Sequence, residues 1–117
     1  MTDFEVQSAQ ADDVAILRLK GYLDAHTVPR FEAAIAKLVK EGQYRILVDM
    51  ENLEYISSAG LGVFMGFIEE VREKNGDIKL CNLTDKVFRV FDLLGFPTLF
   101  DILKTEREAL EKFKATE

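Results

Sequence analysis

The short run Ile46-Leu47-Val48 constrains the fold of this chain more than any other feature of its sequence. Its three residues are aliphatic and do not alternate with polar neighbours, a pattern typical of a central strand that is covered on both faces. A strand of this kind requires helices on both sides of a sheet. The remaining sequence must therefore supply neighbouring strands and the helices that cover them.

The segments before this strand predict a β-hairpin followed by a helix. Phe4 and Val6 alternate with polar residues, and a second extended apolar run occupies 14–19 after a turn-like Ala-Asp-Asp segment, which indicates two paired strands. Thr27 can cap a helix that carries apolar residues at helical spacing and stops at Gly42. The chain thus enters the central strand from a helix.

The segments after the central strand continue the alternation of helix and strand. A second helix is predicted from about Ser58 to Lys74, because apolar residues recur on one side of it before the sequence Asn-Gly. Residues 78–83 predict another strand. Thr84 then caps a third helix, which Gly95 terminates.

The last part of the chain predicts a short strand and a closing helix. Leu99-Phe100 is a short apolar stretch, and residues 105–108 have the form of a capping box. Strand-helix-strand units normally make right-handed parallel crossovers. The prediction is a single α/β domain over residues 1–117, with a mixed, mainly parallel sheet of about four to five strands packed with about four helices.

Composition argues against several classes of partner. The 117 residues include 15 basic and 21 acidic residues, for a net charge of -6, and no block of Lys or Arg could neutralise a nucleic-acid backbone. No run approaches the roughly 18 to 20 apolar residues of a membrane span, and the N-terminal segment lacks the layout of a signal peptide. We therefore expect a cytoplasmic protein that inserts into no membrane and binds no nucleic acid.

Cysteine and histidine offer no basis for a metal site. Cys81 is the only cysteine, so the chain has neither an internal disulfide nor a cysteine cluster for zinc. We predict that Cys81 is a small core residue in a strand. His26 is the only histidine and is predicted to be a solvated loop residue. We expect no bound metal and no cofactor.

Two adjacent serines stand where the second predicted helix begins. A helix N-terminus offers unpaired N–H groups and a partial positive charge, so a phosphate attached to Ser57 or Ser58 would be stabilised there. The alternative is that either serine serves only as an N-cap. A nucleophilic serine is disfavoured, because residues 56–60 lack the first glycine of a G-x-S-x-G elbow.

Small residues follow the serines along the same predicted helix. One face of this helix carries a stripe of small residues, Ala59, Gly62 and Gly66. Such a stripe indicates that another surface approaches the helix closely, either the sheet through tight packing or another protein through docking. Asp24 follows the second predicted strand and should reach the same edge of the sheet as the serines. It also fits a role in the loop or at the helix start, beside Thr27.

Five segments together resemble one protein family. They are G-Y-L-D-A-H-T at 21–27, L-V-D at 47–49, I-S-S-A-G-L-G at 56–62, N-L-T-D-K-V at 82–87 and G-F-P-T-L-F at 95–100. In this order, over nearly the whole chain, they resemble the STAS domain family, and within it the bacterial anti-sigma factor antagonists. A likeness that extends over so much of the chain is more specific than any single motif.

The resemblance implies a partner switch. In such a switch the unphosphorylated antagonist binds an anti-sigma factor, which is also a serine kinase with an ATP-binding, histidine-kinase-like fold, and thereby frees a sigma factor. Phosphorylation of the antagonist ends the binding, and a serine phosphatase is the second implied partner. The resemblance implies a protein without catalytic activity.

The family motif D-S-S-G-x-G maps its phosphorylated serine onto Ser58, with Ser57 as a second candidate. Asp24 matches the family's loop aspartate. The chain departs from the motif at two positions, because Ser57 stands where the family aspartate often stands and Ala59 where the second serine often stands. The implied partner-binding residues are Asp24, Ser57, Ser58, Ala59, Gly60 and Gly62.

Two other functions stay open at this point. Some STAS proteins that resemble this chain are subunits of transporters or sensory complexes, so a scaffold that does not switch is the main alternative. An enzyme is disfavoured, because the residues supply no serine-histidine-carboxylate set, glycine-rich phosphate loop or metal-ligand cluster.

Overall fold

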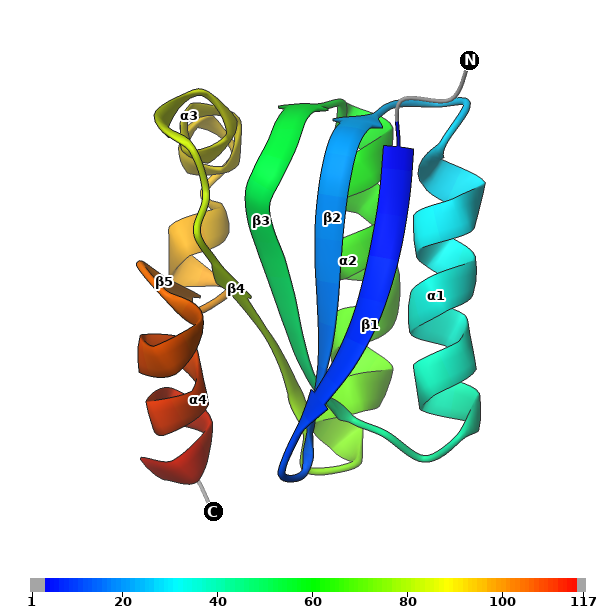
Figure 1. The fold of residues 1–117 in the computed structure, drawn as a ribbon, viewed down its shortest axis with the longest axis vertical. Helices are drawn as coiled ribbons and strands as arrows, with labels where there is room; N and C mark the ends of the chain where they lie inside the picture. The colour runs from blue at the N-terminus through cyan, green and yellow to red at the C-terminus, as the bar shows by residue number, and fades with distance from the viewer. Residues whose placement is uncertain (1–3, 116–117) are drawn as a thin grey trace.

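The computed structural model describes residues 4–115 and shows one mixed sheet with helices on both faces (Figure 1). The strands lie in the order β1-β2-β3-β4-β5; β1 pairs with β2 antiparallel, and the other pairs are parallel. The predicted α/β class is therefore confirmed. The elements are β1 (Phe4–Ala11), β2 (Val14–Leu23), α1 (Val28–Lys40), β3 (Arg45–Ile56), α2 (Ser58–Glu73), β4 (Asp77–Cys81), α3 (Asp85–Leu93), the 3-10 turn η1 (Phe96–Thr98), β5 (Ile102–Leu103) and α4 (Glu106–Ala115).

The central strand is covered on both faces, as its sequence predicts. Ile46, Leu47 and Val48 are each 0% exposed. Ile46 and Val48 belong to the larger core, which α1 and α2 cover, whereas Leu47 packs with residues of α4 on the opposite face. In Figure 1, α2 lies behind the strands, α1 stands to the right of β1, and α4 lies near β4 and β5; α1 and α2 are in contact.

Aromatic rings hold the helices of the larger core together. Phe64 of α2 is 0% exposed, and its ring centroid lies 5.2 Å from that of Phe31 in α1 and 5.8 Å from that of Phe91 in α3. The Phe100 ring approaches Phe64 to 6.0 Å from the segment after η1. One side chain thus joins three helices and the chain that follows them.

The last strand lies later in the chain than the sequence predicts. Leu99-Phe100 is not a strand, because both residues close the 3-10 turn: their N–H groups donate to the carbonyl oxygen of Phe96. Phe100 is buried and its ring stacks on that of Phe96. The strand forms instead at Ile102–Leu103, where the chain pairs with β4.

Strand β4 also ends earlier than predicted. Its last residue is Cys81 rather than Leu83, because Asn82 adopts a φ of 59° and turns the chain out of the sheet. Thr84 caps α3 as predicted, since its side chain accepts a hydrogen bond from the N–H of Val87. Cys81 is 0% exposed, which confirms that it is a core residue.

Replacing Phe64 by Ala should strongly destabilise the chain, because the substitution leaves a cavity among three helices. We expect the free energy of unfolding to fall by about 3 to 5 kcal/mol, measured by urea denaturation. Met65, the next residue, is 48% exposed and supplies the control: Met65→Ala should change the free energy by less than about 0.5 kcal/mol. Equal losses from the two variants would contradict this account of the core.

Candidate functional site

The loop before α1 and the turn before α2 meet at one end of the sheet. Strands β2 and β3 are parallel, and Leu23 is paired with Ile56 at their carboxyl ends. The N–H of Ser57 donates to the carbonyl oxygen of Leu23 at 2.9 Å. Asp24 and Ser57 therefore leave the sheet side by side. Strands β2 and β3 end at the upper edge of the view in Figure 1.

Ser57 is the N-cap of α2. Its backbone is extended, with φ -95° and ψ 170°, and its side chain accepts from the N–H of Gly60, at 3.4 Å. Its carbonyl oxygen accepts from the N–H groups of Gly60 and Leu61. The capping role that the sequence leaves open for either serine thus belongs to Ser57.

Ser58 is the first residue of α2 and its side chain is exposed. It stands beside the N–H groups of the first helical turn, where the helix dipole is positive. The first turn of α2 contains no acidic residue. The surface at this helix N-terminus can therefore accept an anion on Ser58 without repulsion from its own helix.

Asp24 holds the start of α1. Its carboxylate Oδ1 accepts from the N–H groups of His26 at 2.9 Å and Thr27 at 3.2 Å, and its carbonyl oxygen accepts from the N–H of Val28 at 2.9 Å. Thr27 is the N-cap residue of α1, as predicted, but its side chain makes no capping hydrogen bond to the helix. The Thr27 hydroxyl instead accepts from the N–H of Asp24 and donates to the carbonyl oxygen of Tyr22.

The small residues of α2 divide into one that packs on the sheet and three that face solvent. A Cβ on Gly60 would lie 2.9 Å from Cγ1 of Ile56 and 3.0 Å from Leu23, so Gly60 lets the helix start close to the strand ends. Ala59, Gly62 and Gly66 are exposed, and a Cβ on either of these glycines would have no atom within 4 Å. Tight packing on the sheet therefore does not explain the stripe.

A pair of tyrosines that sequence reasoning missed borders the same end of the sheet. Tyr22 and Tyr55 are partners in the parallel register, with ring centroids 6.3 Å apart, and they are 43% and 42% exposed. Tyr22 also lines an open groove with Lys20, the β3 segment 51–54, and Thr84 and Lys86 at the start of α3. The parallel register of β2 and β3 is the signal that could have found this pair.

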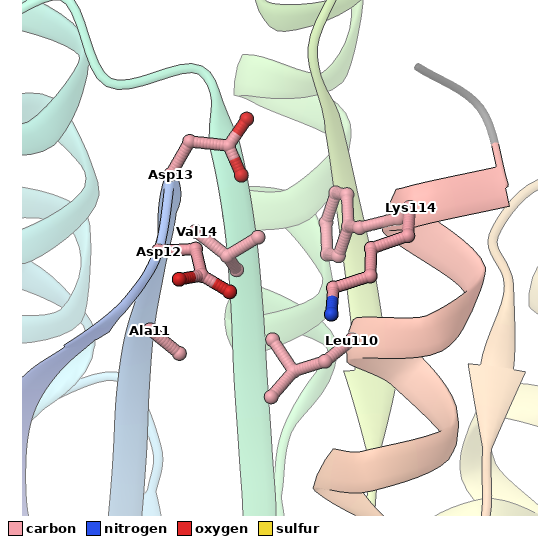
Figure 2. A pocket seen from close by; sticks show the side chains of 7 residues that line it. Ala11, Asp12, Asp13, Val14, Leu110 and Lys114 are labelled. Atoms are coloured by element: carbon pink, nitrogen blue, oxygen red, sulfur yellow. The ribbon is translucent and has the colours of Figure 1, made fainter.

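A second hollow lies at the other end of β2. It has a volume of about 200 Å³ and is formed by the β1–β2 turn and α4 (Figure 2). Figure 2 shows Leu110 pointing from α4 toward the strands and Asp12 on the opposite wall. Because this pocket lies at the amino end of β2, whereas Leu23 ends that strand, it does not belong to the serine site. It is lined by Ala11, Asp12, Asp13, Val14, Leu110, Phe113 and Lys114.

Two other features bear on the class of site. Within residues 4–115, no group of three His, Cys, Asp or Glu side chains is placed to hold a metal ion. No helix in that part of the chain is long and apolar enough to cross a membrane.

Comparison with known families agrees with this geometry. The sequence model of the STAS domain matches residues 5–109, which is most of the chain and includes both the β2–α1 loop and the start of α2. The chain belongs to the STAS domain family.

Its relatives include proteins named for one regulatory role. The chain is 31% identical over 105 residues to the anti-sigma-B factor antagonist of Listeria monocytogenes, covering 89% of this chain and 90% of that protein. It also superposes on the anti-sigma factor antagonist SpoIIAA in its unphosphorylated form, with a TM-score of 0.80, 26% identity and 96% of each chain covered. The phosphorylated form of SpoIIAA from Bacillus gives a TM-score of 0.71 at 26% identity, covering 93% of this chain and 97% of that chain.

Replacing Gly60 and replacing Gly62 of α2 by alanine should change the stability of the chain in opposite directions. Gly60→Ala should destabilise the chain by about 1 to 3 kcal/mol, because its Cβ would overlap Ile56 and Leu23. Gly62→Ala should stabilise it by up to about 1 kcal/mol, because alanine favours the helix and the added methyl faces open space. Thermal unfolding followed by circular dichroism measures both. A loss of stability in Gly62→Ala would show that this face is covered.

Proposed function

We propose that this chain is an anti-sigma factor antagonist that changes partners when Ser58 is phosphorylated. The observation that carries the proposal is the position of Ser58, an exposed hydroxyl at the first residue of α2, beside the loop that holds Asp24. The unphosphorylated chain binds an anti-sigma factor that is also a serine kinase with an ATP-binding, histidine-kinase-like fold, and so releases a sigma factor. A serine phosphatase restores the binding form.

The surface near Ser58 suits a partner that approaches closely. Ala59 and Gly62 are exposed on the same helix, and the first turn of α2 carries no acidic side chain. A phosphate adds about -1.5 to -2 charges to this surface. Because the helix N-terminus stabilises an anion, the modification leaves the fold intact and changes only what the surface can bind.

Ser58 is a better phosphate acceptor than Ser57. The Ser57 side chain is half-buried and engaged with the N–H of Gly60, so a kinase would have to break the cap of α2 to use it. Ser58 is exposed and does not serve as the cap. Ser57 therefore remains the second candidate, although it replaces the family's usual aspartate.

The partner-binding surface divides into contact residues and supporting residues. Ser58, Ala59 and Gly62 are exposed and can touch a partner directly. Asp24 shapes the surface by holding the loop before α1, and Ser57 shapes it by capping α2. Gly60 is buried and acts by letting α2 start against the strand ends. All six predicted residues thus have a place in the proposal.

Two comparisons support this function. The Listeria monocytogenes relative is named an anti-sigma-B factor antagonist, and structures of SpoIIAA are known in the unphosphorylated and the phosphorylated form. We infer that the chain acts in the cytoplasm, where sigma factors operate, and that it acts by binding rather than by catalysis.

Capture from a lysate of the source organism tests the switch. The native chain and Ser58→Ala should both retain an ATP-binding serine kinase, and Ser58→Asp should lose at least about nine tenths of it, because the added charge lies at the centre of the surface. Mass spectrometry quantifies the bound proteins. Ser8→Asp is the control, since it adds the same charge on exposed β1 and should leave binding unchanged.

The same experiment separates the switch from a scaffold. If the native chain, Ser58→Ala and Ser58→Asp retain the same proteins, or only transport subunits, phosphorylation at Ser58 does not control binding. The chain would then be a constitutive subunit of a transporter or sensory complex.

A further inference from the structure

A polar cluster lies beneath the first turn of α4, on the face of the sheet opposite α1 and α2. Arg18 of β2 and Asp49 of β3 are partners in the parallel register. The Arg18 guanidinium reaches Glu106, the first residue of α4, with Nε 2.7 Å from Oε2 and Nη2 3.0 Å from Oε1. The fork of the arginine is therefore engaged with one carboxylate, although a second one lies next to it.

Asp49 is that second carboxylate. It is only 5% exposed, and its two oxygens accept from the N–H of Glu51 at 2.9 Å and from the side-chain amide of Asn82 at 3.1 Å. Neither donor carries a charge. The cluster thus combines one guanidinium with two carboxyl groups, which leaves one excess negative charge under α4 whenever both are ionised.

A buried carboxylate without a cation of its own tends to keep a proton. Burial, and after it the neighbouring Glu106 carboxylate, raise the pKa of Asp49 to about 6. The hydrogen bond from Arg18 lowers the pKa of Glu106 to about 2. The proton in this cluster is consequently on Asp49 and leaves it near neutral pH.

Other charged or titratable groups do not cancel this effect. The charged or titratable groups that act on Asp49 from the packed elements are Arg18 on β2, the buried Cys81 thiol on β4 and Glu106 on α4. Burial raises the pKa of the Cys81 thiol, so it stays uncharged. Arg18 supplies the one positive charge, and it is shared with Glu106.

Helix α4 depends on this cluster at its N-terminal end. Farther along, Ala109 and Phe113 are buried against apolar side chains of the sheet, and the Lys79 ammonium lies 4.8 Å from the centre of the Phe113 ring. At the first turn, the contacts to the sheet are those of Glu106 with Arg18 and Asp49. Ionisation of Asp49 therefore weakens the docking of α4 at its first residue, where Glu106 contacts the sheet.

We propose that the Asp49–Glu106 carboxyl pair is a pH-sensitive clasp that holds the start of α4 on the sheet while Asp49 is protonated and loosens it when the proton leaves. The direction of the pH dependence follows from a comparison of the state with α4 docked and the state with α4 detached at its start. Asp49 binds its proton more tightly when α4 is docked than when it is exposed to water, so docking is favoured at low pH and weakens as the pH rises through about 6. The proposal concerns the isolated chain and does not depend on the partner switch.

The buried thiol of Cys81 reports on this opening. Cys81 is 0% exposed and neighbours Asp49 in the register of β3 and β4, in the cluster that α4 covers. The rate at which Cys81 reacts with a thiol reagent is measured from about pH 5 to about pH 8. Each rate is divided by the rate at which glutathione reacts with the same reagent at that pH, which removes the effect of thiolate ionisation. The normalised rate should rise about tenfold over this range for the native chain, in proportion to the opening.

Variants of the two carboxyl groups decide the proposal. Asp49→Asn should give a normalised rate that does not change with pH. Glu106→Gln should give a smaller rise than the native chain, because it removes the neighbouring carboxylate but leaves Asp49 buried. Glu111→Gln, on an exposed turn of α4, is the control and should keep the native profile. If Asp49→Asn does not fold, Glu106→Gln alone decides. A flat native profile, or a native rise in Glu106→Gln, overturns the proposal.

Discussion

The parallel pairing of β2 with β3 is the interaction on which the candidate site depends. It ends at Leu23 and Ile56, where the N–H of Ser57 bonds to the carbonyl oxygen of Leu23. This hydrogen bond fixes where α2 begins relative to the loop that caps α1. A slip in the register would separate Asp24 from the serine turn and turn the buried residues of β3 toward the wrong helices.

The division of labour between the two serines follows from that geometry. Ser57 completes the backbone hydrogen bonds at the start of α2, so Ser58 is left exposed beside a positive helix end. A phosphate on Ser58 can then change the surface without a change of fold. Because the first turn of α2 contains no acidic residue, a phosphate on Ser58 meets no charge repulsion from its own helix.

Local sequence patterns predicted most of the elements but not the contacts between distant segments. The apolar run at 46–48 and the cap at Thr84 depend on neighbouring residues alone, and both predictions were correct. The sequence places the final strand at Leu99-Phe100 rather than at Ile102–Leu103, because no local pattern shows that the rings of Phe96 and Phe100 stack on each other. The Tyr22–Tyr55 pair and the contact of Asp49 with Glu106 depend on strand register and helix docking, which periodicity does not define.

The most direct test of the central claim is to locate the phosphate itself. The native chain is incubated with ATP and an extract of the source organism, and the modified residue is identified by tandem mass spectrometry. Our account predicts a single phosphate on Ser58, and its loss in Ser58→Ala while Ser57 is still present. A phosphate on Ser57 or on another residue would contradict the account. So would a chain that stays unmodified in an extract in which other anti-sigma factor antagonists become phosphorylated.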